Sequence, residues 1–470
     1  MAARVENEGI DMAVLVLGAG VIGLTTAYYL QQAGHRVTVV DRHPHVATET
    51  SYANGAQLSY SYVAPLAGPG VLSKLPKWFI DADAPMRFRP TLDPDLWRWC
   101  RRFVSACTRT QSLRATREML ALSFLSRDLM REMIAAEPSL AFDYTRSGKL
   151  VLHRSPEALS AAVDLLAFQR TLGCEQEALD ADACVAREPA LAHVRNEIAG
   201  GIYTRSEDTA DCHLFCVGIE RLLRSRGVEF ALGTSISALQ TAADGTVSAT
   251  TADGDRLQAE HIVVAMGSDS VPLLKSIGIH VLMYPLKGYS LTVTTRERNP
   301  ATHLETRHGA DVVTSVHGVM NGANDAAPAT APSISITDFA RKVVYARLGN
   351  RLRIAGMADL GRPNRDLEKN RLATLRREAE ALFPDAGDYE HATPWAGLRP
   401  ATPTGLPIIG RTRIPNLWVN IGQGALGFTL ATGSAKLLAD GLSGIPSSID
   451  CSAYSLLAHC SLADNALRAG

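Results

Sequence analysis

The feature that most constrains the fold is a glycine-rich turn near the N-terminus, set between two apolar segments. Residues 13–17 are all apolar, a GxGxxG pattern occupies residues 18–23, and residues 24–32 read as a helix. Residues 35–40 then read as a second strand. A continuous apolar run is typical of a parallel strand covered on both faces. The order strand, glycine turn, helix, strand predicts a βαβ dinucleotide-binding unit.

Each glycine of this turn has a physical role. Gly18 permits a tight turn, Gly20 lets a pyrophosphate approach the backbone, and Gly23 lets the helix pack closely on the strand. The helix N-terminus stabilises the phosphate charge. Asp41 ends the second strand, where it can accept hydrogen bonds from ribose hydroxyls. An acid at this position disfavours the 2′-phosphate of NADP, so FAD and NAD remain.

Two further glycine-rich turns bear on this choice. Residues 259–267 read as a strand that enters a glycine turn. Residues 416–421 read as a strand, followed by a glycine turn at 422–427 and a helix at 428–442. A glycine-rich turn before a helix is typical of an anion or polar-ligand site. Nucleotide-type elements therefore occur at the start, middle and end of the chain. This spread indicates a doubly wound domain interrupted by insertions, the layout of many FAD enzymes.

Composition and charge exclude several classes of protein. The 470 residues carry 47 Lys plus Arg against 48 Asp plus Glu, a net charge of −1, which argues against a nucleic-acid binder. Apolar residues make up 46% and charged residues 20%, as in ordinary soluble globular proteins. The 8 cysteines include no CxxC pair and the 13 histidines form no HExxH pattern. We therefore predict no metal site.

The N-terminus has no secretory pattern, and glycines interrupt the uncharged stretch at residues 12–30. We therefore expect a cytoplasmic protein whose uncharged stretch is the βα unit and not a membrane span. Residues 96–117 contain 6 arginines and no acid, with Trp97, Trp99 and Phe103 interleaved. This segment is either an interfacial helix in peripheral contact with the inner face of the cell membrane, or a solvated helix whose tryptophans pack inward.

Several stretches carry a resemblance to a known family, namely residues 16–23, 49–54, 64–70, 284–291, 397–403 and 422–429. Together they resemble the D-amino acid dehydrogenase small-subunit family, within the D-amino acid oxidase and glycine oxidase superfamily, over nearly the whole chain. The resemblance implies non-covalent FAD and oxidative deamination of D-amino acids to 2-oxo acids and ammonia. It also implies that electrons pass to a respiratory quinone or another acceptor that is not oxygen.

The chain departs from this family at two positions. The family usually has His where Gln423 stands and Trp where Phe428 stands, and both positions are expected near the flavin. The substrate range therefore stays open. The alternatives are a related amine or imino-acid oxidase or dehydrogenase, acting on glycine, D-proline or hydroxyproline, and a non-catalytic flavoprotein subunit.

The predicted fold is α/β, with a Rossmann-like FAD-binding domain interleaved with an α+β substrate-binding domain on an antiparallel or mixed sheet. The FAD-binding domain is expected to use residues 1–80, 185–280 and 390–470, and the substrate-binding domain residues 81–184 and 281–389. Within the latter, residues 302–330 are rich in Gly, Ala, Asn and Pro. They read as an inserted surface loop, either a lid or an inert excursion.

The predicted cofactor-binding residues come from these turns, from the polar segment after the second strand and, by resemblance, from the expected adenine site. They are Val16, Leu17, Gly18, Ala19, Gly20, Val21, Ile22, Gly23, Asp41, Arg42, Thr50, Ser51, Asn54, Gly55, Ala56, Gln57, Ile236, Ala265, Gly267, Arg399, Gly422, Gln423, Gly424, Leu426, Gly427, Phe428 and Thr429.

Four residues are candidates for catalysis. Arg399 is expected to hold the substrate carboxylate, since the guanidinium fork matches two oxygens; its alternative is a structural ion pair with a buried acid. Tyr289 is expected either to line the substrate cavity or to belong to the core, and Tyr62 is a weaker candidate. Gln423 or the backbone N–H groups after it are expected to stabilise negative charge on the reduced flavin, aided by the helix dipole.

Overall fold

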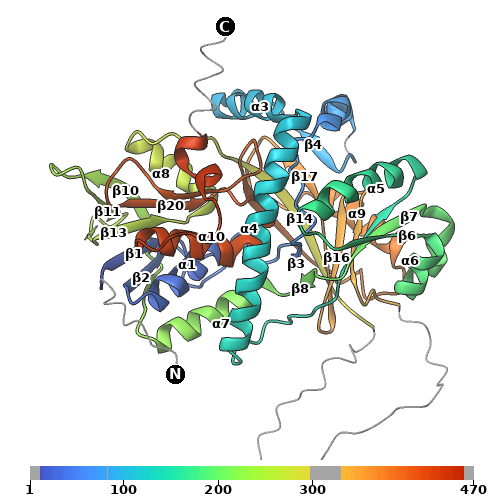
Figure 1. The fold of residues 1–470 in the computed structure, drawn as a ribbon, viewed down its shortest axis with the longest axis horizontal. Coiled ribbons are helices and arrows are strands. Elements are labelled where there is room, and N and C mark those ends of the chain that lie inside the picture. Colours follow the sequence, from blue (N-terminus) through green and yellow to red (C-terminus); the bar gives the residue numbers. More distant parts are fainter. Residues whose placement is uncertain (1–10, 82, 297–329, 460–470) are drawn as a thin grey trace, which may run out of the picture.

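The computed structural model describes residues 11–81, 83–296 and 330–459 and is built around two sheets that lie side by side (Figure 1). A six-stranded sheet has the strand order β19-β20-β13-β1-β2-β9. All neighbours in it are parallel except β19 and β20. Its strands are β1 (Ala13–Leu17), β2 (Arg36–Asp41), β9 (Glu229–Leu232), β13 (His261–Val264), β19 (Ile408–Arg411) and β20 (Leu417–Ile421).

Both faces of the six-stranded sheet are covered, which explains the continuous apolar run in β1. Val14 and Val16 belong to a core formed with helices, whereas Leu15 and Leu17 belong to a second core on the other face. The helical core includes α1 (Val21–Gln32), α4 (Arg109–Ala136), α7 (Cys212–Ser225) and α10 (Gly427–Leu442). The second core includes β10 (Ile236–Thr241), β11 (Val247–Thr251), β12 (Arg256–Leu257) and α8 (Ser270–Ser276).

The second sheet is mixed and has nine strands, in the order β18-β14-β17-β16-β15-β5-β7-β6, with β4 beside β17. Its strands are β4 (Met86–Phe88), β5 (Lys149–His153), β6 (Gln176–Asp180), β7 (Gly200–Thr204), β14 (Tyr284–Thr294), β15 (Ser335–Asp338), β16 (Val343–Leu348), β17 (Arg351–Leu360) and β18 (Thr393–Ala401). The two-stranded ribbon of β3 (Gln57–Leu58) and β8 (Asp208–Thr209) lies apart from both sheets.

One face of the nine-stranded sheet packs on α6 (Ala181–Arg187) and α9 (Lys369–Leu382) to form a core of its own. Helix α2 (Leu75–Ile80) contacts β4 and α3 (Pro94–Ala106) contacts β14, whereas α5 (Pro156–Thr171) contacts β5, β6 and β7. In α3, Trp99 and Phe103 are buried against β4 and β14, whereas Trp97 is exposed. The inward position of Trp99 agrees with the interpretation of residues 96–117 as a solvated helix whose tryptophans pack inward, whereas Trp97 does not follow that pattern. No helix in the described residues is long and apolar enough to cross a membrane.

Several elements belong to a different domain from the one to which the prediction assigns their residues. β7 and β18 are strands of the nine-stranded sheet, although the prediction places their residues in the cofactor domain. Helix α4 falls in the predicted substrate domain, yet it packs on α10 in the helical core. Hydrogen-bonding and apolar partners that are distant in the sequence decide these placements, so local pattern carries no signal for them. The predicted loop at 302–330 lies, apart from Thr330, outside the described residues.

Candidate active site

A cavity of about 1590 Å³ lies between the two sheets. Its cofactor side is formed by the ends of β1, β2 and β20 and the turns that follow them, and its other side by β14, β17 and β18. Ligands of open α/β sheets bind outside the carboxyl ends of the strands. The cavity therefore begins where the fold favours a dinucleotide.

The N-terminal glycine turn is shaped by backbone crowding. Gly18 has a φ of +110°, and a Cβ there would stand 2.6 Å from the carbonyl oxygen of Ala265. A Cβ at Gly23 would overlap the carbonyl group of Gly18. The N-terminus of α1 follows at once, with Gly20 as an N-cap that has no side-chain cap. The turn thus presents bare backbone and a helix N-terminus, which suits a pyrophosphate.

Asp41 lies at the carboxyl end of β2 and lines the cavity. One carboxylate oxygen accepts a hydrogen bond from the Ala19 N–H at 2.7 Å, and the other accepts one from the His43 N–H at 2.9 Å. An ionised carboxylate has about four acceptor sites, so acceptor capacity remains. Asp41 therefore fixes the glycine turn and can still accept hydrogen bonds from ribose hydroxyls.

Hydrogen bonds anchor the polar segment after β2 to the nine-stranded sheet. The Thr50 hydroxyl donates to the Leu398 carbonyl at 2.8 Å. The Ser290 hydroxyl donates to the Ala53 carbonyl at 2.7 Å, and Arg353 donates to the Asn54 carbonyl at 2.8 Å. These contacts hold residues 53–57 along the cavity wall.

The third glycine turn closes the cofactor side of the cavity. Gly422 has a φ of +83° and Gly424 one of +57°, so both take the left-handed conformation that glycine adopts without strain. Gln423 is buried between them and donates to Asn420 Oδ1 at 2.7 Å. Helix α10 begins at Gly427. Its N-terminus adds positive partial charge at the cavity wall.

Arg399 reaches the cavity from β18, opposite Leu286 of β14. A Cβ at Gly288 would overlap its guanidinium group, so the missing side chain leaves room for Arg399. Among the described residues, no acidic side chain forms an ion pair with Arg399, and burial lowers the pKa of its guanidinium. Since arginine stays protonated in proteins, the cavity holds a cation that receives no counter-charge from the described residues.

Comparison with known proteins assigns this geometry to a family. The model of the DAO family, described as FAD dependent oxidoreductase, matches residues 13–441. The chain belongs to the FAD-dependent oxidoreductase family. This match confirms the predicted family and the choice of FAD over NAD. The cavity fits FAD by its bare glycine turns, its two helix N-termini and the acceptor at Asp41.

Two curated relatives are similar over most of their lengths. The chain is 48% identical to "D-amino acid dehydrogenase 2" of Ralstonia nicotianae over 91% of this chain and 96% of the relative. It is 42% identical to the "D-amino acid dehydrogenase 2" of Pseudomonas aeruginosa over 93% and 96%. Two solved structures have a similar fold at low sequence identity. A glycine oxidase from Geobacillus kaustophilus has a TM-score of 0.70 at 19% identity, covering 95% of this chain and 98% of that one. An L-proline dehydrogenase from P. horikoshii has a TM-score of 0.67 at 12% identity, covering 95% and 97%. These structures confirm the predicted fold class.

Most of the predicted cofactor residues line the cavity of this oxidoreductase. Five lie behind its wall and act through the backbone or through packing: Val16, Leu17, Ala19, Gly23 and Thr429. Thr429, for example, accepts a hydrogen bond from the Ser59 N–H at 3.0 Å. The other predicted residues, from Gly18 to Phe428, border the same cavity although they come from distant parts of the sequence. Their roles toward FAD stay predictions.

Tyr289 and Tyr62 differ in how the structure places them. Tyr289 touches the cavity wall, but its ring is buried in the core on the α9 face and its hydroxyl donates to Asp359 Oδ2 at 2.9 Å. Of the two predicted roles, a place in the core therefore fits Tyr289 better, and its hydroxyl is already hydrogen-bonded to Asp359. The ring of Tyr62 lines the cavity below Lys149, whose Nζ lies 4.3 Å from the ring centroid. Burial raises the pKa of Tyr62 to about 12.

Two buried basic residues were not predicted from the sequence: Lys149 lines the cavity, and Arg353 lies outside its lining but holds a segment that does line it. Arg353 holds the Asn54 carbonyl, and Lys149 donates to Ser59 Oγ at 2.7 Å. Both are buried. Each stands in a strand of mostly apolar residues, β5 or β17, and a charged residue in such a strand was the signal available. Whether it faced a cavity or an acidic partner depended on the sheet packing.

Proposed function

We propose that this oxidoreductase catalyses the oxidative deamination of D-amino acids to 2-oxo acids and ammonia, with non-covalently bound FAD. The observation that carries the proposal is Arg399, a cation on the cavity wall without an acidic partner among the described residues. A substrate carboxylate supplies the missing charge through a bidentate contact. The names of the similar dehydrogenases support the D configuration.

The protein's contribution is mainly positioning and exclusion of water. The chemistry that bound FAD would supply is acceptance of a hydride from the substrate Cα, for which no protein base would be needed. Arg399 orients the carboxylate, and on the same strand Trp395 lines the cavity. Leu286 and Met357 add apolar walls. Fixing the carboxylate beside these walls restricts the directions in which Cα–H can point, which is the main source of rate enhancement proposed here.

Negative charge that develops on the cofactor requires stabilisation as well. Gln423 and the N-terminus of α10 border the cavity. A helix N-terminus favours nearby negative charge by about 0.3–1 kcal/mol when exposed and more when buried. Non-covalent attachment of the flavin is proposed from the resemblance to the D-amino acid dehydrogenase family. Acid precipitation is expected to release the flavin into the supernatant.

Anaerobic bleaching of the flavin tests the proposed reaction. Purified yellow protein is mixed with a panel of D- and L-amino acids, and the flavin absorbance is followed without oxygen. We expect D-amino acids to bleach it and their L enantiomers to leave it oxidised. If no amino acid bleaches the flavin, the enzyme does not act on amino acids. Bleaching only by glycine or D-proline would assign it to the related amine oxidases.

We further propose that electrons leave to a respiratory quinone and that the protein contacts the inner face of the cell membrane. Support comes from exposed apolar side chains around α2 and α3, among which Ile80 and Leu92 are 84% and 99% exposed. Exposed arginines such as Arg98 and Arg101 lie on α3. Apolar and basic side chains together favour an anionic lipid surface. Flotation with anionic and neutral liposomes tests this contact, and absence of binding to both at low salt would exclude it.

A further inference from the structure

The cavity extends well beyond the surroundings of Arg399, into a space between α5 and the strands β5 and β7. We call this space the α5 arm. On α5 it is lined by Ala158, Ala162, Leu165 and Leu166, which follow one face of the helix. These four side chains are half-buried, and Gln169 alone among the residues of α5 is buried. The apolar face of α5 thus borders open space instead of core.

The opposite wall of the arm is formed by alternate residues of β5. Lys149, Val151 and His153 line the cavity, whereas Leu150 and Leu152 between them belong to the core on the other face. This alternation is the ordinary period of a strand. It shows that the arm lies on the cavity face of the nine-stranded sheet.

The arm is separate from the position of the substrate carboxylate. Arg399 stands on β18 and Lys149 on β5, and the strand order places β14, β17, β16 and β15 between them. Adjacent strands are about 4.8 Å apart, so the two strands are separated by roughly 24 Å along the sheet. An amino acid held by Arg399 does not extend into the arm. The arm is therefore available to a second ligand.

Polar groups at or behind the wall of the arm have unused hydrogen-bonding capacity. Lys149 donates one hydrogen bond, to Ser59 Oγ, although an ammonium group has three donors. Glu207 lies behind it and accepts from the Ser61 N–H at 2.6 Å through one carboxylate oxygen. Among the described residues, neither Glu207 Oε2 nor His153 Nδ1 has a hydrogen-bond partner, and both side chains are buried. Unpaired buried polar atoms are uncommon and call for an explanation.

We propose that the α5 arm binds a quinone as electron acceptor, with Lys149 as its polar contact. This inference rests on the proposed function, because a quinone is needed only if the enzyme oxidises a substrate without oxygen. The apolar residues of α5 suit a flat ring and its alkyl chain, and Lys149 suits a ring carbonyl. The arm is continuous with the cofactor cavity.

The chemistry balances with these two reactants. A D-amino acid loses the hydrogen on Cα and one hydrogen on nitrogen, and a C=N bond forms. The two electrons and two protons released convert the two C=O groups of the quinone to C–OH groups. Burial lowers the pKa of Lys149 and raises that of Glu207. Lys149 lines the arm where the quinone oxygen is proposed to lie, with Glu207 buried behind it.

Separate measurement of the two half-reactions tests the arm. The holoenzyme is first bleached anaerobically by a D-amino acid and then mixed with decylubiquinone. Ala162→Trp fills the arm, and Ala167→Trp, on the exposed outer face of α5, is the matched control. We expect Ala162→Trp to slow reoxidation by at least about tenfold and to leave the bleaching rate within about twofold. The control is expected to change neither rate.

Binding provides a readout that does not depend on turnover. A photoreactive azidoquinone is expected to label peptides of α5 or β5, and the label should be lost in Ala162→Trp and retained in Ala167→Trp. Lys149→Met should slow reoxidation as well, and the double variant Lys149→Met with Glu207→Gln removes the uncompensated acid if the single variant does not fold. Equal reoxidation in both tryptophan variants, or labelling confined to the Arg399 end, would overturn the proposal. Failure of any amino acid to bleach the flavin would instead refute the proposed function.

Discussion

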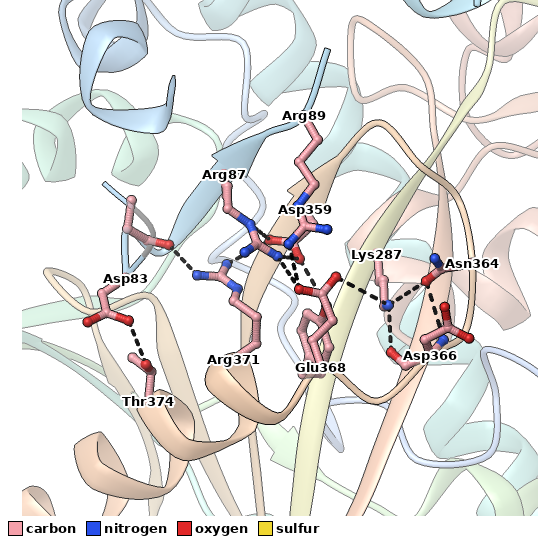
Figure 2. Close-up of polar contacts among 12 residues, drawn as sticks. Asp83, Arg87, Arg89, Lys287, Asp359, Asn364, Asp366, Glu368, Arg371 and Thr374 are labelled. Carbon is pink, nitrogen blue, oxygen red and sulfur yellow. Dashed lines mark hydrogen bonds and ion pairs between the residues drawn. The ribbon is translucent and has the colours of Figure 1, made fainter. Parts of the chain in front are cut away.

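The two faces of the nine-stranded sheet differ in whether their buried cations have partners within the protein. On the α9 face, Arg87 and Arg371 share Asp359 at 2.5 and 2.9 Å, and Arg87 also contacts Glu368 at 2.8 Å (Figure 2). Lys287 donates to Asn364 and to the Asp366 carbonyl in the same cluster (Figure 2). Each of these cations has a partner within the protein.

On the cavity face, Arg399 has no acidic partner among the described residues. Removing one member of a paired buried cluster leaves an uncompensated charge and destabilises the fold. Removing an unpaired cation leaves no such charge, but it deletes the contact that a ligand carboxylate requires. Pairing within the protein therefore distinguishes a structural cation from one available to a substrate.

The largest expected effect is a loss of folding stability when a cation of the α9 face is removed. Arg371→Met should destabilise the fold by about 3–5 kcal/mol, because Asp359 loses a partner in a buried cluster. Urea unfolding measures this loss. The KM for the amino acid should stay unchanged in protein that remains folded at low temperature. A raised KM with unchanged stability would show that the cluster serves the substrate and would remove the contrast between the two faces.

On the cavity face the expected loss is in binding. Arg399→Ala should weaken interaction with a carboxylate substrate by about 2–5 kcal/mol, as for truncation of one partner of a charge pair. Steady-state kinetics with a D-amino acid measure it, and Arg399→Lys is the control that keeps the charge without the fork. An unchanged KM for Arg399→Ala would refute its role as the carboxylate contact.

Tyr289 tests the difference between the two faces, because it touches the cavity wall while its hydroxyl belongs to the paired cluster on the α9 face. Tyr289→Phe removes a hydrogen bond to the Asp359 carboxylate and should cost about 1.5–3 kcal/mol of stability. Since that hydroxyl is directed to Asp359, kcat/KM should change little. A large loss of kcat/KM with wild-type stability would instead place the hydroxyl at the substrate.

The smallest effect concerns acid stability. Burial opposes ionisation of Glu368, but hydrogen bonding to Arg87 and the charges of Arg87, Arg89 and Lys287 lower its pKa below 4.5. A lowered folded-state pKa contributes stability above the unfolded pKa and loses it as the pH falls through the folded value. Glu368→Gln should therefore flatten the decline in urea midpoint below about pH 4.5. An equally steep decline in this variant would show that Glu368 does not contribute to it.

The local sequence pattern was sufficient to predict the first secondary-structure elements on the cofactor side of the cavity. The run at 13–17, the glycine turn and the strand ending at Asp41 appear in the structure as β1, α1 and β2. These elements follow from contacts between near neighbours in the sequence, such as the packing of Gly23 on Gly18. The pairing of β7 and β18 with the nine-stranded sheet was not accessible in this way, because their partners are remote.

The sequence by itself determined the dinucleotide unit, the family and Arg399 as the candidate for the carboxylate, since each depends on residue type at a short spacing. Only the tertiary structure decided which charged side chains have partners. Arg371 and Arg399 are equally basic in the sequence, yet Arg371 forms an ion pair with Asp359 and Arg399 faces a cavity. The same holds for Lys149, whose strand position predicted nothing about the α5 arm. Burial and counter-charge depend on segments far apart in the chain, and the folded sheets alone bring those segments together.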